Sequence, residues 1–235
     1  LSEAAHSGAD LFAAIVAAIA VRISDKPPDR NHPYGHGKVE NVSGVIEGLL
    51  IFAAAAFIIV ESVKKIIHPG SFEITFLPIL VMVISAVVNL FVSKHLYKVA
   101  REEDSIALEA DALHLKTDVY TSAGVALGLI LIKLTGNTIL DPLVAIAVAM
   151  LIIYEAWHLC KNAFNPLLDS SLSEEEETAI MNILEKHFTK DFHFCGLKTR
   201  KSGSTKFVDF YARVSPEIPI KEASEMTKHI QQEIQ

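Results

Sequence analysis

The stretch VIEGLLIFAAAAFIIVESV, residues 45–63, decides the fold class because it carries only two ionisable side chains, Glu47 and Glu61. A helix needs about 20 mostly apolar residues to cross the hydrocarbon core of a bilayer. Residues 76–92 contain no ionisable group, and residues 139–159 contain only Asp141, Glu155 and His158. The mean hydropathy of the whole chain is +0.35, which is high for a soluble protein. The sequence therefore predicts a membrane protein.

The apolar stretches predict five membrane-spanning helices, at about residues 4–24, 42–67, 74–97, 106–134 and 139–161. Residues 1–164 are thus expected to form an all-α transmembrane bundle. The chain begins with Leu1 and has no basic segment before its first span, so it does not read as a signal peptide. We expect at least one further helix to precede residue 1.

After residue 165 the composition becomes charged and predicts a small α+β domain over residues 165–235. Ser173 and Glu176 have the spacing of a helix capping box. The stretch KFVDFYARV, residues 206–214, alternates apolar and polar side chains, as a strand does, and a turn is expected at Ser202 and Gly203 before it. Residues 219–235 read as a helix, and we expect one more strand beyond residue 235.

Charge and cysteine usage exclude several classes of protein. The formal net charge of −7 leaves no broad basic surface for nucleic acid. Cys160 and Cys195 are too far apart for a zinc ribbon or a disulfide scaffold. The HExxH motif of a zinc protease is absent from the sequence, so we expect no enzymatic activity.

Basic residues near the span ends predict the orientation of the chain. They are concentrated in the loop 25–38 and the turn 94–101, whereas the opposite side carries Lys64, Lys65 and Lys133. Because cytoplasmic loops are enriched in Lys and Arg, the first side is expected to be cytoplasmic. Four predicted spans, an even number, lie between loop 25–38 and the C-terminal domain, which is therefore expected on the same side.

Two of the spans carry matching polar stripes. EAAHSGAD, residues 3–10, and DALHLKTD, residues 111–118, share one order: an acid, a histidine three residues later and an aspartate four residues after that. Residues i and i+4 lie on the same face of a helix. The stripes therefore bring His6 with Asp10, and His114 with Asp118, to one face of each helix. Asn89, in another span, is expected to donate a hydrogen bond between helices.

An ionisable side chain inside a membrane costs from about 2.5 to more than 10 kcal/mol unless it is paired or faces a cavity. If the two stripes face each other, two imidazoles and two carboxylates converge, and this ligand set suits a tetrahedral zinc ion. Iron or cobalt would also fit. The alternative is that each pair only makes hydrogen bonds between helices.

A second cluster of candidate ligands lies in PPDRNHPYGHGKVE, residues 27–40. Asp29, His32 and His36 fall within this short stretch, which its prolines and glycines keep out of helix. It reads either as a further metal site on the cytoplasmic side or as a solvated polar loop.

The order of these motifs resembles the cation diffusion facilitator family of divalent-metal transporters in bacteria and archaea. The matching stretches are HxxxD in the first span, HPYGHGKVE in the loop, LEADALHLKTDVYTSAGV in a later span, LLDSSLSEEE after the last span and LKTRKSG with KFVDF in the tail. The resemblance covers essentially the whole chain. It implies six helices, of which these five would be the second to the sixth.

The resemblance also implies roles for individual residues. His6, Asp10, His114 and Asp118 would form the transport site, and Asp29, His32 and His36 the loop site. Lys38 would form a salt bridge with Asp169. The tail would be a ferredoxin-like cytoplasmic domain through which two copies form a homodimer. In zinc-binding bacterial members the tail holds further metal at positions that are Cys195, Tyr211 and Ser224 here, so that site is not expected.

The expected function is export of a divalent metal, with Zn²⁺ as the substrate that two histidines and two aspartates favour; Fe²⁺, Mn²⁺, Co²⁺ and Cd²⁺ remain alternatives. Protonated imidazole does not bind metal, and histidine titrates near pH 6.5, so protons and metal would compete for the site. We expect a multi-pass protein of the cell (inner) membrane that exchanges metal for protons. A membrane metal sensor without transport is the other interpretation.

Overall fold

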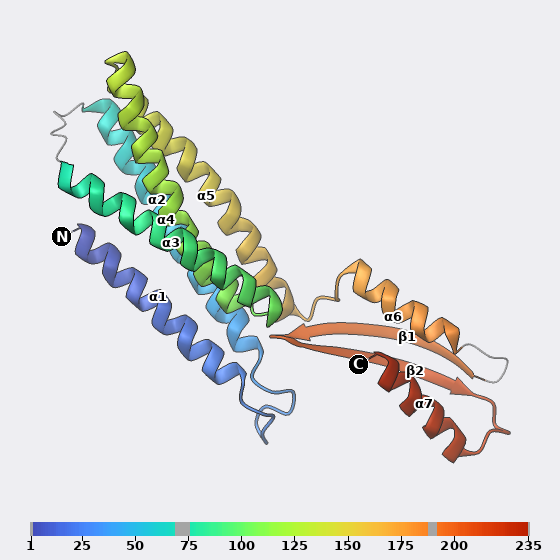
Figure 1. The fold of residues 1–235 in the computed structure, drawn as a ribbon. Helices are drawn as coiled ribbons and strands as arrows, with labels where there is room; N and C mark the ends of the chain where they lie inside the picture. Colours follow the sequence, from blue (N-terminus) through green and yellow to red (C-terminus); the bar gives the residue numbers. More distant parts are fainter. Residues whose placement is uncertain (1, 69–75, 188–191, 235) are drawn as a thin grey trace.

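The computed structural model describes residues 2–68, 76–187 and 192–234, with the backbone alone for residues 2–7, 9, 10 and 76–79. It confirms the predicted class: a bundle of long apolar helices is followed by a small α+β domain (Figure 1). The helices of the bundle are α1 (Ser2–Ser24), α2 (Lys38–Ile67), α3 (Phe76–Glu102), α4 (Ile106–Thr135) and α5 (Leu140–Phe164). A short 3-10 helix, η1 (Asn165–Leu168), leads out of the bundle.

Four of these helices are long and apolar enough within the described residues to cross a membrane: α2, α3 from Leu80, α4, and α5 together with η1. The described apolar part of α1, Leu11–Ser24, is shorter. Helix α4 shows how the sequence sets such a segment. The Ser105 hydroxyl accepts a hydrogen bond from the Leu108 backbone N–H at its start, and Gly136 ends it in the left-handed conformation with φ 73°.

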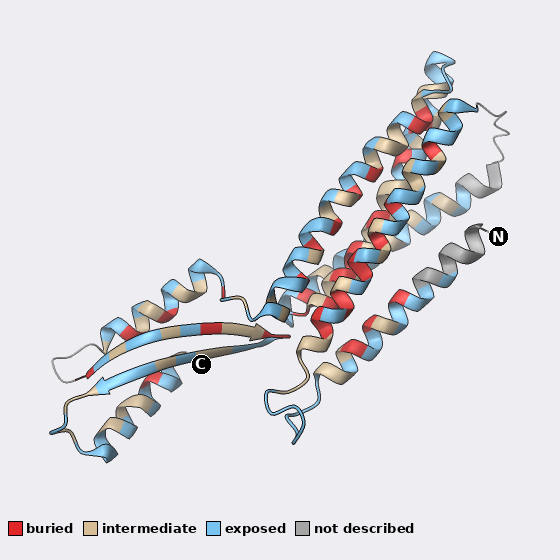
Figure 2. Cartoon of the chain, turned by 180° about the vertical axis from the view of Figure 1, so that it is seen from behind, coloured by how far each residue is buried: buried red, intermediate tan, exposed pale blue. Residues whose placement is uncertain are grey.

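The centre of the bundle, where α2, α4 and α5 meet, combines alanines with larger aliphatic side chains (Figure 2). Ala55, Ala110 and Ala156 are fully buried there, with Ile51 and Ile152 beside them. Small residues let helix backbones approach closely, which is how helices associate in lipid, where the hydrophobic effect adds little. Helix α1 contacts α2 and α4, and α3 packs against α4.

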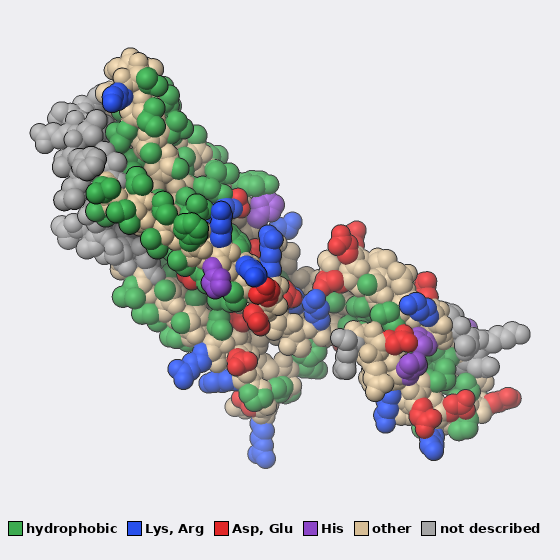
Figure 3. All heavy atoms as spheres, in the orientation of Figure 1, with side chains coloured by type: hydrophobic (Ala, Val, Ile, Leu, Met, Phe, Trp, Pro, Cys, Tyr) green, Lys and Arg blue, Asp and Glu red, His purple; other side chains and the backbone are tan. Residues whose placement is uncertain are grey.

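The outer surface of the bundle is apolar, as a lipid-facing surface must be (Figure 3). Large side chains point outward from several helices; Phe91 is 70% exposed and Trp157 is 63% exposed. In a soluble protein such side chains would be the core. The many large apolar side chains on the outer surface support the prediction of a membrane protein.

The C-terminal domain contains α6 (Glu174–Lys186), β1 (Phe192–Ser202), β2 (Thr205–Val214) and α7 (Ile220–Ile234). The two strands pair antiparallel, with Ser202 opposite Thr205 across the turn, and Gly203 has φ 60°, which confirms the predicted turn. Leu184 of α6, Phe192 of β1 and Ile230 of α7 are buried in a common core. The tip of this hairpin reaches the end of the bundle that carries the loop 25–37 (Figure 1).

The predicted capping box at the start of α6 is confirmed, and it predicts how the stability of the C-terminal domain depends on pH. The Ser173 hydroxyl accepts from the Glu176 N–H, and the Glu176 carboxylate accepts from the Ser173 N–H. Lys206 is 2.7 Å from the same carboxylate. The hydrogen bond from Lys206, followed by that from Ser173, lowers the pKa of Glu176 from 4.5 to about 2.

Because the folded state lowers this pKa, the ionised carboxylate stabilises the domain above pH 4.5, and the gain is lost as the pH falls toward 2. The Glu176 side chain is 37% exposed, so solvent screening reduces the gain to about 1–2 kcal/mol. Thermal unfolding should therefore show Glu176→Gln less stable than the unsubstituted protein at pH 7 and equal to it near pH 2. Glu175→Gln, which changes an exposed neighbour, is the control. A gap that persists at pH 2 would contradict this account.

Candidate metal centre

The two polar stripes lie on helices that contact each other, α1 and α4. His6 and Asp10 fall within α1, but their side chains lie outside the described residues. His114 and Asp118 lie one turn apart on α4, and both are half-buried. The four side chains can converge only if α1 and α4 are in contact, as they are here.

A hydrogen bond from α3 helps to orient the Asp118 carboxylate on α4. Asn89 of α3 donates from Nδ2 to Oδ2 of Asp118 over 3.3 Å, which confirms the interhelical role expected for this residue. The Thr117 and Thr121 hydroxyls donate to the backbone carbonyls of His114 and Asp118, at 2.7 and 3.0 Å. The threonines thus satisfy their own polar groups within the helix, as hydroxyls in membrane helices commonly do.

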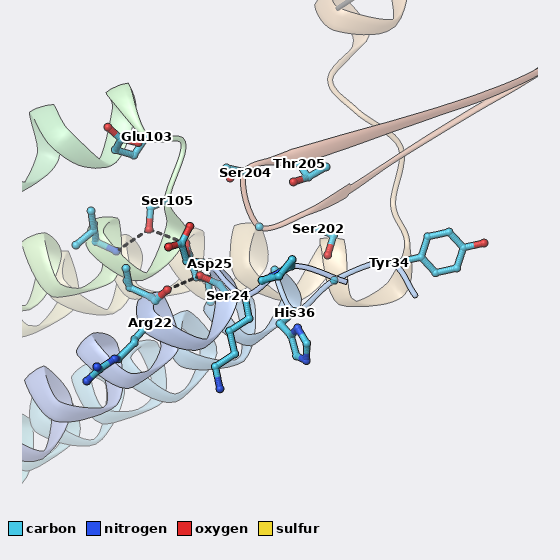
Figure 4. A pocket seen from close by; sticks show the side chains of 18 of the residues that line it. Arg22, Ser24, Asp25, Tyr34, His36, Glu103, Ser105, Ser202, Ser204 and Thr205 are labelled. Atoms are coloured by element: carbon cyan, nitrogen blue, oxygen red, sulfur yellow. Dashed lines mark hydrogen bonds between the residues drawn. The ribbon is translucent and has the colours of Figure 1, made fainter. Parts of the chain in front are cut away.

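A cavity of about 890 Å³ opens beneath this stripe, at the end of the bundle that meets the hairpin (Figure 4). Its walls come from α1, α2, the start of α4, the loop between α1 and α2, and the hairpin tip. The ionisable side chains that line it are Arg22, Asp25, Lys26, His36, Glu40, Glu103 and Asp111. Asp111 precedes His114 by three residues and shares its helix face. The cavity therefore reaches from the loop to within one helical turn of His114.

Glu40 joins the ends of three helices beside this cavity, a role that the sequence did not reveal. Its carboxylate is buried and accepts hydrogen bonds from the Ser24 hydroxyl of α1 at 2.7 Å and from the Ser105 hydroxyl that caps α4 at 2.6 Å (Figure 4). The two serines lie far from Glu40 along the chain, and neither has a distinctive sequence context. Only the fold brings them together.

The structure brings Asp29, His32 and His36 together in the loop. One ligand atom from each of the three side chains lies within 4.8 Å of the others. The Asp29 carboxylate is 3.2 Å from His32 Nδ1 and 3.5 Å from His36 Nε2. Gly35, with φ 82°, makes the turn between the histidines, a conformation that side chains other than glycine rarely adopt.

The loop also orients its ligands in advance. The backbone N–H groups of Asn31 and His32 donate to Asp29 Oδ1 at 2.8 and 2.7 Å. The hydrogen bond from the His32 N–H is the main cause of a lowered pKa for Asp29, so the carboxylate is ionised at neutral pH. His36 Nδ1 is buried and has no hydrogen-bond partner. An aspartate and two imidazoles in this arrangement can hold a divalent ion with room for a further ligand.

Lys38 and Asp169, which the family resemblance pairs, are 2.9 Å apart. Lys38 begins α2, and Asp169 follows η1 in the left-handed conformation with φ 55°. Arg200 of β1 lies 3.4 Å from the same carboxylate. The hydrogen bond from Lys38 is the main cause of the lowered pKa of Asp169. This pair ties the start of α2 to the exit of the bundle and to the hairpin.

The hairpin tip docks closely on the loop, through contacts that the sequence did not reveal. Gly37 lies so near the Ser202 carbonyl that a Cβ atom at residue 37 would overlap it. The Arg200 guanidinium lies 4.3 and 4.7 Å from the centroids of the Tyr34 and Phe207 rings, which pack edge to face against each other. Tyr34 is in the loop, between the two histidines, so the candidate loop site and the C-terminal domain are in direct contact.

The family's metal positions in the tail are not assembled into a cluster of ligands here. Cys195 and Tyr211 face each other across the hairpin, and both are exposed. Within the part of the chain that the structure describes, no group of three close metal-binding side chains includes Cys195.

Comparison with known proteins covers the whole chain. Residues 1–168 match the model of the cation efflux transmembrane domain, and residues 172–235 match that of the cytoplasmic domain of cation efflux proteins. The uncharacterized transporter sll1263 of Synechocystis is 35% identical over 91% of this chain and 69% of its own length.

Two further relatives are similar over nearly all of the chain. The magnetosome protein MamB of Magnetospirillum gryphiswaldense is 31% identical over 100% of this chain and 78% of its own length. The cation-efflux pump FieF of Pectobacterium atrosepticum is 28% identical over 99% of this chain and 77% of its own length. With both family models matched in order along a bundle of apolar helices and a small α+β domain, the chain belongs to the cation diffusion facilitator family of membrane transporters that export divalent metal cations.

Proposed function

We propose that this protein exports zinc in exchange for protons, through a tetrahedral site made by His6, Asp10, His114 and Asp118. The observation that carries the proposal is the cavity, which runs from the loop to within a turn of His114 between the two helices that bear the stripes. Divalent ions entering there would meet Asp111 first and then the face of α4 that carries His114 and Asp118.

The choice of zinc rests on ligand chemistry. Two imidazole nitrogens and two carboxylate oxygens match zinc's borderline character, whereas magnesium, calcium and manganese prefer sets of oxygen ligands. Iron, cobalt and cadmium remain the competing substrates. Measuring the flux of each of these ions, and of manganese, into proteoliposomes would rank them as substrates.

Proton exchange follows from the ligands themselves. An imidazole must be neutral to bind zinc, so a site that opens to an acidic side releases its ion as its ligands take up protons. Helices that alternate the opening of one central site between the two sides would then move metal and protons in opposite directions, as in other secondary transporters.

Zinc flux into proteoliposomes with and without a pH gradient tests this proposal. With the vesicle interior acidic, zinc uptake reported by an enclosed fluorescent indicator should be several-fold faster than without a gradient. An ionophore that collapses the gradient should remove the difference. Zinc uptake that is indifferent to the gradient would rule out proton exchange, and an absence of uptake would rule out zinc transport.

We further propose that Asp29, His32 and His36 capture metal at the mouth of the cavity, since His36 lines that cavity and the other two contact each other beside it. His32→Ala should then raise the zinc concentration for half-maximal flux several-fold and leave the maximal rate nearly unchanged. Asn31→Ala, a change at the neighbouring loop position, is the control. Equal zinc dependence of His32→Ala and the unsubstituted protein would exclude this role.

The proposal also covers the orientation of the chain in the membrane and the assembly of two copies. The loop, the turn after α3 and the hairpin lie at one end of the bundle; Lys201 of β1 is 2.6 Å from Asp104 of that turn. The basic residues there support a cytoplasmic location for this end, in the inner membrane of the cell. We propose residues 1–164 as the transport unit and residues 165–235 as the domain that joins two copies.

A further inference from the structure

A second group of metal-binding side chains lies in the C-terminal domain, apart from the bundle and the loop. His187 immediately follows α6, and His229 and Glu233 are one turn apart on α7. One ligand atom from each of the three lies within 4.8 Å of the others. Figure 3 shows histidine and acidic side chains gathered on the surface of this domain.

The geometry is close to what a zinc ion requires. His187 Nε2 is 3.1 Å from Glu233 Oε2, and His229 Nε2 is 3.5 Å from Glu233 Oε1. Ligand atoms around tetrahedral zinc, each about 2.0–2.1 Å from the metal, are about 3.3 Å apart. The imidazole rings of His187 and His229 pack edge to face, with centroids 5.4 Å apart at 82°.

The three side chains are also accessible without being loose. His187 is 22% exposed and Glu233 is 37% exposed, while His229 is 63% exposed and open to an incoming ion. Neighbouring Ile230 is buried in the domain core, which fixes the helix that carries His229 and Glu233. Two nitrogens and one oxygen leave a fourth position for water or another ligand.

This cluster is distinct from the tail positions considered above. It includes neither Cys195 nor Tyr211, which are on the strands, nor Ser224, which precedes His229 on α7. It also joins two helices that are far apart in the sequence.

We infer that His187, His229 and Glu233 form a divalent-metal site for zinc or a similar borderline ion, which clamps the end of α6 to α7. Such a clamp makes the packing of the C-terminal domain depend on metal concentration.

Zinc binding to the full chain, purified without a histidine tag, tests the inference by isothermal titration calorimetry. The titration uses a chain carrying Asp118→Ala and His36→Ala, so that the transport and loop candidates no longer contribute. This chain should bind one zinc ion. Adding His229→Gln or Glu233→Gln should weaken that binding at least tenfold, whereas Glu225→Gln, an exposed acid elsewhere on α7, should leave it unchanged.

Thermal unfolding of the same chains provides a second readout. Zinc should raise the unfolding temperature of the doubly substituted chain and of its Glu225→Gln derivative, and should not raise that of the His229→Gln derivative. The inference would be overturned if the chain bound no zinc, or if zinc binding persisted when both His187→Gln and His229→Gln were present. Either result would mean that the two histidines only form hydrogen bonds with the Glu233 carboxylate. Neither calorimetry nor thermal unfolding measures metal flux, so failure of this inference can be distinguished from failure of the transport proposal.

Discussion

Asp118→Ala is expected to reduce zinc flux in proteoliposomes about 100-fold or more. Removal of groups that merely orient a metal ligand costs 10–100-fold in affinity or activity, and Asp118 is proposed as a ligand itself. Asp118 is half-buried on α4, and its neighbours are helices rather than bulk solvent. A water molecule would therefore replace the lost carboxylate ligand poorly.

Two companion variants make this result specific. Asp209→Ala removes an exposed aspartate from β2 and should leave the flux unchanged. Asn89→Ala removes the donor to Asp118 and should reduce the flux less than Asp118→Ala does, by about tenfold. Flux by Asp118→Ala equal to that of the unsubstituted protein would end the assignment of the transport site.

Gly37→Val should separate the hairpin from the loop. The Ser202 carbonyl and the Gly203 backbone occupy the space that a side chain at residue 37 needs, and backbone cannot move aside as a flexible side chain can. Overpacking of this kind costs about 1–3 kcal/mol. The contacts of Arg200 with Tyr34 and of Lys38 with Asp169 would lose their support.

Hydrogen–deuterium exchange measures this separation in the full protein. Peptides covering residues 34–40 should exchange at least several-fold faster in Gly37→Val, while peptides from α5 should not change. Thr205→Val, which alters the neighbouring turn at nearly constant volume, is the control. Unchanged exchange around residue 37 in Gly37→Val would show that the hairpin does not hold the loop.

Periodicity and composition predicted the helices because each is long and apolar and ends at ordinary signals, such as Ser105 before α4 and Gly136 after it. The same holds for the capping box at Ser173, which is a local pattern. The candidate ligands in the loop could also be named from the sequence, since Asp29, His32 and His36 fall within a few residues of one another.

Apart from the pair of Lys38 with Asp169, which the family resemblance implied, the contacts between distant parts of the chain could not be predicted. Glu40 meets Ser24 and Ser105, and Tyr34 meets Arg200, only because the helix ends and the hairpin converge in three dimensions. Nothing in the local sequence of a serine distinguishes an interhelical donor from a solvated hydroxyl. The cluster of His187 with His229 and Glu233 of α7 was not predicted either, because its members come from different helices.

The most direct test of a single metal ion held by four ligands from α1 and α4 is X-ray absorption at the zinc edge. It should use a chain in which His36→Ala and His229→Gln remove the other two candidate sites. The account predicts one bound zinc with two imidazole nitrogens and two carboxylate oxygens at about 2.0–2.2 Å. Zinc bound with one imidazole or none, or no bound zinc, would contradict it.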